Sequence, residues 1–205
     1  MALIIDVETT GLPIRNGLKY GEFPPYEKLN LYDTSRVVQI TLMLCNEKLE
    51  QVELKDFIIK ADNFSIDNSS FHGITNEISE NKGIPFSEVV EVIKLYLPKV
   101  THIIAHNLNF DISILYSELY RLNMHSVISD VKSKGMICSM KDTKNIVRST
   151  NNYGIKDPSL KELYYFVFHK DMENAHNSKY DVINLHLSIK NLFDNNKLNY
   201  KFEFN

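Results

Sequence analysis

Acidic residues stand in three separated segments of the sequence. Asp6 and Glu8 follow a short apolar run, Asp111 lies in the first turn of a predicted helix, and Asp181 lies inside the last predicted helix. In an extended strand a spacing of two places Asp6 and Glu8 on one face, where their repulsion is costly unless a cation lies between them. Taken singly, Asp111 and Asp181 are more simply explained as ordinary helix acids, and the helix dipole favours an acid in a first turn. The four acids together favour one shared site.

A histidine precedes the last of these acids. His176 lies five residues before Asp181, so the two side chains would be about 140° apart if both were helical, and they would not share a face. If His176 instead lies in the loop that leads into the helix, it can reach over the acidic site. An imidazole with its ordinary pKa of about 6.5 takes up a proton near neutral pH. The alternative for His176 is a helix-capping residue without a chemical role.

The hydrophobic pattern predicts the elements that must bring these residues together. An apolar run leads to Asp6, and two β-rich segments flank a turn at residues 46–49, which is typical of an antiparallel hairpin. The later segments show helical spacing, and one helix is expected to stop at Pro98. The predicted strands are residues 2–7, 36–44, 51–59 and 102–105, and the predicted helices are residues 86–97, 110–122, 159–168 and 176–193. This order predicts an α/β fold in which helices pack on a mixed sheet.

The length and composition are those of one globular domain. The 205 residues can bury a sizeable core without splitting, and 43% are hydrophobic. We expect a single domain over residues 1–193 and a poorly ordered tail over residues 194–205. No apolar run approaches the roughly 18 residues that cross a bilayer, and Asp6 comes too early for a signal peptide. We therefore expect an intracellular protein, cytoplasmic or nuclear, without a membrane partner.

Charge is unevenly distributed along the chain. The formal net charge of −3 argues against a protein that coats nucleic acid by bulk electrostatics. Residues 131–161 nevertheless carry seven basic and two acidic side chains, a local charge of +5, and form a candidate phosphate-facing surface. Ordinary solvated lysines are the alternative explanation. Residues 13–35 contain prolines and glycines without periodicity and predict a loop, whose length is typical of functional loops.

Four short motifs follow one another along the chain. They are Asp-Val-Glu-Thr-Thr-Gly-Leu at residues 6–12, His-Gly-Ile-Thr at 72–75, Ala-His-Asn-Leu-Asn-Phe-Asp at 105–111 and Ala-His-Asn-Ser-Lys-Tyr-Asp at 175–181. In their order and spacing they resemble the DEDDh 3′→5′ exonucleases, the proofreading and TREX-type branch of the ribonuclease H-like superfamily. The resemblance spans residues 2 to about 193. It implies a ribonuclease H-like mixed five-stranded sheet flanked by helices, with strands one to three antiparallel and the later strands parallel.

The resemblance also implies roles for individual residues. The implied ligands of two divalent cations, Mg²⁺ or Mn²⁺, are Asp6, Glu8, Asp111 and Asp181, and the implied general base is His176. The implied substrate-binding residues are Thr9, Thr10, Gly11, Leu12, Phe71, His72 and Asn107. Leu12 and Phe71 would flank an unpaired terminal base, although His72 is also explained as the residue that holds the turn at Gly73. One departure from the family is Ser178 in place of the usual Ala, which we expect to be tolerated because it adds little volume.

Such a site predicts a 3′→5′ exonuclease that hydrolyses single-stranded nucleic acid by a two-metal mechanism and releases nucleoside 5′-monophosphates. The opening motif favours DNA, but an RNA-directed enzyme of the same family stays open, since the residues that read a 2′-hydroxyl are not evident. The expected partners are a nucleic acid with a free 3′ end and a polymerase or another replication or repair protein. A catalytically dead module that docks on a polymerase or helicase is the alternative of another class, and the presence of all five implied catalytic residues argues against it.

Overall fold

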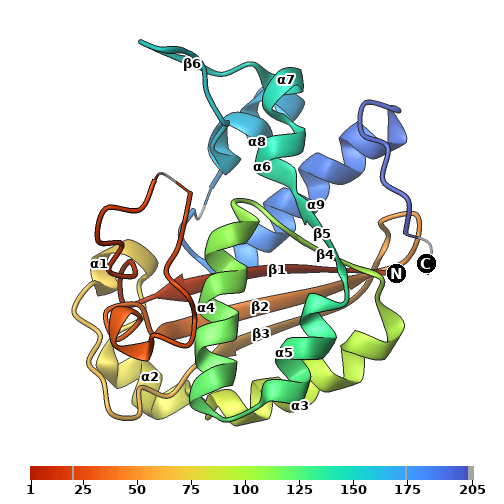
Figure 1. Ribbon diagram of the computed structural model, residues 1–205. Helices are drawn as coiled ribbons and strands as arrows, with labels where there is room; N and C mark the ends of the chain where they lie inside the picture. The colour runs from red at the N-terminus through yellow and green to blue at the C-terminus, as the bar shows by residue number, and fades with distance from the viewer. Residues whose placement is uncertain (20, 174, 203–205) are drawn as a thin grey trace.

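A five-stranded mixed sheet lies at the centre of the computed structural model, which describes residues 1–19, 21–173 and 175–202 (Figure 1). The strands are β1 (Ala2–Thr9), β2 (Val37–Cys45), β3 (Gln51–Ile58), β4 (His102–Ala105) and β5 (Gly135–Cys138), in the spatial order β3-β2-β1-β4-β5. The first three strands are antiparallel, whereas β4 and β5 run parallel to β1. The predicted fold class is therefore confirmed.

Helices cover both faces of the sheet, as Figure 1 shows. The longer ones are α2 (Asn76–Lys82), α3 (Phe86–Tyr96), α4 (Leu108–Arg121), α5 (His125–Lys132), α8 (Leu160–Phe168) and α9 (Ser178–Asp194). The short elements are α1 (Ser69–His72), α6 (Ser139–Asp142), α7 (Lys144–Val147), two 3₁₀ turns (Leu29–Leu31 and Leu97–Lys99) and a small hairpin of β6 (Thr150–Asn151) and β7 (Gly154–Ile155). One core cluster joins the sheet to α3, α4 and α5, and a second joins it to α8 and α9.

The two-residue repeat of β1 decides which face carries the acids. Leu3 and Ile5 belong to the core under α3, α4 and α5, whereas Ile4 belongs to the core under α8 and α9. Because successive side chains of a strand point to opposite faces, Asp6 and Glu8 continue the face of Ile4. The α9 face of the sheet therefore presents both carboxylates near the end of β1.

Several boundaries differ from the sequence prediction for physical reasons. β1 continues through Glu8 to Thr9 because these residues keep pairing with β2. α9 begins at Ser178, so His176 lies in the preceding loop, where its φ of +67° does not suit a helix. Four strands were located from the sequence. β5 is as short as β4, but it was missed because it follows a polar stretch and is only partly buried.

Part of the predicted tail after α9 packs against the rest of the protein. Leu198 and Phe202 are buried and belong to the core cluster of α8 and α9. The Phe202 ring also packs edge-on against His102 at the start of β4, with 5.6 Å between ring centres. Residues 203–205 of the predicted tail lie outside the described residues. In the described part of the chain, no helix has the length and apolar character needed to cross a membrane.

The predicted loop over residues 13–35 is anchored along α4. The Tyr32 side chain is fully buried and its hydroxyl donates to the Pro24 carbonyl at 2.5 Å. Arg121 of α4 donates to Asp33 at 2.6 Å and to the Leu29 carbonyl at 3.1 Å. These contacts fix the loop beside the end of β1.

Candidate active site

Three carboxylates from distant parts of the chain meet on the α9 face of the sheet. Asp6, Glu8 and Asp181 each offer one oxygen, and the three oxygens lie within 4.8 Å of one another. Asp6 and Glu8 come from the same face of β1, and Asp181 comes from the first turn of α9. Carboxylate oxygens at this spacing suit hard divalent cations, which prefer oxygen ligands.

The fourth predicted acid approaches from α4. Asp111 lies in the first turn of α4 and is only 2% exposed. Its Oδ1 accepts a hydrogen bond from the Val7 backbone N–H at 3.1 Å, between the two acids of β1 in the sequence. The left-handed conformation of Asn107, with φ of +71°, turns the chain from β4 into α4 and aims the helix start at the acids. The structure therefore brings all four predicted acids to one place.

The pKa values of the four acids reflect their crowding. Burial, followed by repulsion from the other three carboxylates, raises the pKa of Asp6 well above its ordinary value. Burial raises the pKa of Glu8 from 4.5 to about 7 and that of Asp181 from 3.8 to about 6, and for Glu8 the charge of Asp181 adds to the effect. Burial also raises the pKa of Asp111, against the hydrogen bond from Val7. Acids that repel one another in this way gain most from a bound cation.

One buried carboxylate oxygen of the cluster lacks a hydrogen-bond donor in the described part of the chain. Among the described residues, nothing hydrogen-bonds to Asp181 Oδ1, which is buried, while Oδ2 accepts from the His176 backbone N–H at 3.2 Å. A buried carboxylate oxygen without a hydrogen-bond donor is costly unless an ion or water satisfies it. This oxygen and the crowded acids fit a divalent cation better than they fit a purely structural cluster.

The start of α9 is fixed to β2 by buried hydrogen bonds. Ser178 Oγ lies 2.7 Å from Thr41 Oγ1, and the Ser178 backbone N–H donates to Gln39 Oε1 at 3.3 Å. Asp56 of β3 in turn accepts from both Gln39 and Thr41. The hydroxyl of Ser178 therefore has a buried partner, and it helps to hold Asp181 one turn later.

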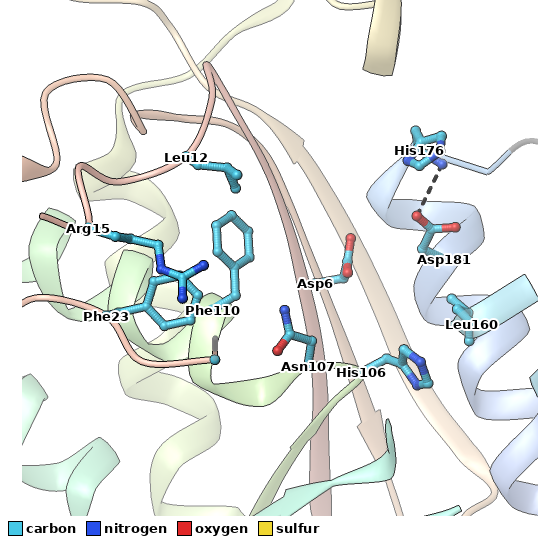
Figure 2. Close-up of a pocket in the computed structure, with 11 residues that line it drawn as sticks. Asp6, Leu12, Arg15, Phe23, His106, Asn107, Phe110, Leu160, His176 and Asp181 are labelled. Carbon is cyan, nitrogen blue, oxygen red and sulfur yellow. Dashed lines mark hydrogen bonds between the residues drawn. The ribbon is translucent and has the colours of Figure 1, made fainter. Parts of the chain in front are cut away.

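His176 lies at the edge of the acidic cluster. Its side chain is exposed, and Figure 2 shows the imidazole above Asp181 on the side of the pocket opposite Leu12. The interaction drawn between His176 and Asp181 is the backbone hydrogen bond. Within residues 1–19, 21–173 and 175–202, no partner occupies the ring nitrogens of His176, so they can face a substrate or water. The loop position that sequence reasoning required for His176 to reach the site is the one observed.

A second histidine supports the site from below. The His106 Nε2 atom donates to the Pro158 carbonyl at 2.9 Å, and Nδ1 lies 3.0 Å from Ser139 Oγ. Burial lowers the pKa of His106 to about 4, so the ring is neutral near pH 7. His106 thereby joins the turn before α4 to the residues that lead into α8.

A cavity of about 500 Å³ opens beside the acids (Figure 2). Predicted site residues that line it are Asp6, Leu12, Asn107, His176 and Asp181. Its volume falls within the range of small-molecule sites, roughly 300–1,000 Å³. The cavity is therefore large enough for one nucleotide next to the carboxylates.

The far wall of the cavity comes from residues that sequence reasoning did not single out. Phe23 and Phe110 pack with 5.7 Å between their ring centres, and the Arg15 guanidinium lies 5.7 Å from the centre of the Phe23 ring. Of the described residues that line the cavity, Arg15 alone carries a fixed positive charge. Its side chain also donates to the Lys19 carbonyl, while its Nε has no hydrogen-bond partner in the described chain.

The remaining predicted substrate-binding residues lie outside the cavity lining. Thr9 donates to the Gly11 carbonyl at 2.6 Å, and Thr10 Oγ1 accepts from the Arg36 backbone N–H at 2.9 Å. A Cβ on Gly11 would lie 2.9 Å from the Thr34 carbonyl oxygen, so this close approach requires glycine. These contacts hold the turn that presents Leu12, which is 67% exposed.

The motif at residues 72–75 also supports the end of β1. His72 is buried, its Nδ1 accepts from the Ile74 N–H, and its Nε2 lies 3.1 Å from Asn68 Oδ1. Asn68 donates in turn to the Thr9 carbonyl at 3.0 Å. Both ring nitrogens of His72 are thus used within the protein, whereas Phe71 is 69% exposed and does not line the cavity.

Known proteins are similar to this chain at the level of a family and of the fold. A family model described as "Exonuclease" matches residues 3–187. A comparison with curated proteins found no match. Among solved structures, the zinc-bound complex of E. coli exonuclease I with single-stranded DNA superposes with a TM-score of 0.70 at 18% identity. The alignment covers 94% of this chain and 40% of that one, so this chain spans well under half the length of exonuclease I.

Two further structures have the same fold. Exonuclease X in complex with 5′-overhanging duplex DNA gives a TM-score of 0.57 at 17% identity, covering 97% of this chain and 95% of that one. A 3′-exonuclease that recognises a histone mRNA stem-loop gives a TM-score of 0.61 at 15% identity, with coverages of 95% and 81%. At these identities the likeness concerns the fold alone.

Proposed function

The chain belongs to the exonuclease family, and we propose that its carboxylate site removes nucleotides from the 3′ end of a single-stranded nucleic acid, with DNA as the favoured substrate. The convergence of Asp6, Glu8 and Asp181 to within 4.8 Å is the observation that carries this proposal. A protein that used the fold only for docking would gain nothing from burying several carboxylates that repel one another.

The four acids would hold the cations that the reaction needs. Asp6, Glu8, Asp111 and Asp181 supply carboxylate oxygens from three elements, and the unpartnered Oδ1 of Asp181 is available as a ligand atom. Bound there, two Mg²⁺ or Mn²⁺ ions would offset the charge of the phosphate, acidify a water molecule and stabilise the leaving oxygen. The raised pKa values of the metal-free acids are consistent with a site in which cation charge is expected.

His176 is suited to accept the proton of the attacking water. Its backbone is fixed to Asp181, while its imidazole is exposed beside the acids (Figure 2). A free ring nitrogen in this place can take the proton as the water attacks the scissile phosphorus. The terminal 5′-phosphate would then leave with its nucleoside, and the shortened strand would keep a 3′-hydroxyl.

The aromatic cavity would hold the terminal nucleoside. Leu12 and Phe110 provide apolar surface on which an unpaired base can stack, and this contact does not read sequence. Arg15, fixed against Phe23, offers N–H donors to a polar edge of the base or sugar. A paired terminus would have to open before its last base could enter this cavity, which supports a preference for single strands.

Digestion of end-labelled oligonucleotides tests the proposal. Single-stranded DNA, blunt duplex DNA and RNA of one sequence are incubated with Mg²⁺ or with chelator, using 5′-labelled strands so that shortening from the 3′ end gives a ladder. We expect a ladder from single-stranded DNA with Mg²⁺, less from the duplex and RNA, and none with chelator. Faster digestion of RNA than of single-stranded DNA would show that RNA is the preferred substrate. The absence of a ladder from every strand would contradict the proposed activity.

A further inference from the structure

A small hairpin projects from the top of the molecule in Figure 1. β6 and β7 pair antiparallel, Thr150 with Ile155 and Asn151 with Gly154. Tyr153, in the turn between them, is 98% exposed and is the most exposed large hydrophobic side chain in the described part of the chain. An aromatic ring held almost wholly in water contributes little to the stability of the fold.

Two ion pairs stabilise the base of the hairpin. Lys144, before the hairpin, pairs with Asp157, after it, at 3.0 Å, and Lys156 pairs with Glu162 of α8 at 2.6 Å. The Lys156 backbone N–H also donates to the Ser149 carbonyl at 2.8 Å, which closes the hairpin at its root. Tyr153 therefore lies at the tip of a hairpin whose base is fixed to the rest of the protein.

A groove of about 790 Å³ runs along the base of this hairpin. Residues that line it include Tyr153, Asn151, Pro158, Ser159, Lys156 and the ion pair of Lys144 with Asp157. Leu160, the next residue, lines the active-site cavity, and so does His106, whose ring donates to the Pro158 carbonyl. The groove and the active-site cavity therefore adjoin the same short segment, residues 158–160.

The charge around the groove complements a polyanion. The hairpin lies within residues 131–161, which have a local charge of +5 in a chain of net charge −3. The lysines that line the groove, Lys144 and Lys156, are each paired with an acid. Three further cations of this segment, Lys141, Arg148 and Lys161, are exposed, do not line the groove and have no ion pair within the described residues. Positive charge is thus concentrated in the segment that carries the hairpin.

We propose that the groove beside the β6–β7 hairpin binds the single-stranded nucleic acid that precedes the 3′ end, with Tyr153 stacked on one of its bases. An exposed aromatic ring combined with cations along a groove is the pattern by which proteins hold single strands without reading sequence. The inference rests on the proposed function, because it assigns the groove to the strand whose end lies among the carboxylates.

Substrate length separates this surface from the catalytic site. Kinetics are measured with Mg²⁺ on a dinucleotide and on a sixteen-nucleotide oligothymidylate for the wild type, Tyr153→Ala and Tyr153→Phe. We expect Tyr153→Ala to raise KM for the long strand about five-fold or more, the lower end of the range for a base stacked on an aromatic ring, and to leave the dinucleotide unchanged. Tyr153→Phe keeps the ring and should behave as the wild type.

Tyr165→Ala is the matched control. Tyr165 is 55% exposed on α8 and lines neither the groove nor the active-site cavity, so its removal should affect neither substrate. An equal rise in KM for both lengths after Tyr153→Ala, or no rise for either, would overturn the proposal.

Binding without catalysis distinguishes this inference from the proposed function. Fluorescence anisotropy of the labelled sixteen-nucleotide strand is measured in chelator with the wild type and Tyr153→Ala. Weaker binding by Tyr153→Ala supports the groove even if no strand is hydrolysed, an outcome that would reject only the proposed activity. Equal binding by both proteins would reject the groove as a nucleic-acid surface.

Discussion

Replacing Glu8 by glutamine should stabilise the metal-free protein and at the same time remove its nuclease activity. Burial and the charge of Asp181 raise the pKa of Glu8 from 4.5 to about 7. A carboxyl whose pKa is higher in the folded than in the unfolded state contributes fully to stability below pH 4.5, and the contribution is lost as the pH rises through 7. Ionised Glu8 therefore lowers the free energy of unfolding of the metal-free protein in mild alkali.

The size of the effect follows from the same pKa values. At about 1.4 kcal/mol per pH unit, the difference between 4.5 and about 7 is worth about 3 kcal/mol at pH 8 as an upper bound. Glu8 is partly exposed, and water screens part of this repulsion, so a gain of about 1–2 kcal/mol is expected for Glu8→Gln. The gain in stability should disappear near pH 4, because protonated Glu8 in the wild type is then as neutral as the glutamine of the variant.

Denaturant unfolding in chelator, followed by circular dichroism at pH 5 and pH 8, measures this gain. Mg²⁺ should then stabilise the wild type more than Glu8→Gln, because the variant lacks one ligand. Glu47, an exposed acid in the turn before β3, gives the control Glu47→Gln, which should change little at either pH. A Glu8→Gln protein that is less stable than the wild type at pH 8 in chelator would refute the account of the crowded acids.

Three further substitutions test the supporting structure. Glu118→Gln should lower the free energy of unfolding by about 2–3 kcal/mol, because it leaves Arg36, now paired with Glu118 at 2.7 Å, without a buried counter-charge; a loss under 1 kcal/mol in urea unfolding would contradict this. Ser178→Ala should cost about 1 kcal/mol by removing the bond to Thr41, and unchanged thermal unfolding would show that the bond contributes nothing. Phe110→Ala should raise KM about ten-fold through lost stacking with Mn²⁺ affinity unchanged, so a normal KM would exclude Phe110 from the nucleotide cavity.

Part of the acidic cluster could be predicted from the sequence because local rules position some of its members. The two-residue period of β1 places Asp6 and Glu8 on one face, whatever the rest of the chain does. Asp111 was predicted in the first turn of its helix and lies there. Asp181 was predicted further inside a helix starting near residue 176 and lies in the first turn of α9, and its role beside the other acids was implied by the resemblance to the exonucleases. The loop position of His176 was one of two alternatives, since a single residue beyond a helix boundary is difficult to assign from sequence.

The aromatic wall could not be predicted, because long-range contacts place it. Arg15 and Phe23 lie in the aperiodic segment 13–35, whose path depends on contacts with α4 such as that between Arg121 and Asp33. Phe110 belonged to a recognised motif but was interpreted only as part of a helix. The available signal was an aromatic residue immediately before a candidate ligand at a helix start.

The predicted substrate-binding residues fall into two groups in the structure. Leu12 and Asn107 line the cavity, whereas Thr9, Thr10 and His72 make hydrogen bonds that hold the end of β1. Short polar side chains next to a turn commonly bond to the backbone, and motif position alone does not separate this role from substrate contact.

The most direct test is a calorimetric titration of Mn²⁺ into the wild type and Asp6→Asn, in parallel with digestion of a 5′-labelled single strand. Asp6 lies among the other three acids, so its charge should be needed for cation binding at the cluster. We expect the wild type to bind two Mn²⁺ ions per chain and to shorten the strand, and Asp6→Asn to lose both properties while keeping its fold. A wild type that binds no Mn²⁺, or an Asp6→Asn protein that digests the strand at the wild-type rate, would contradict the central claim.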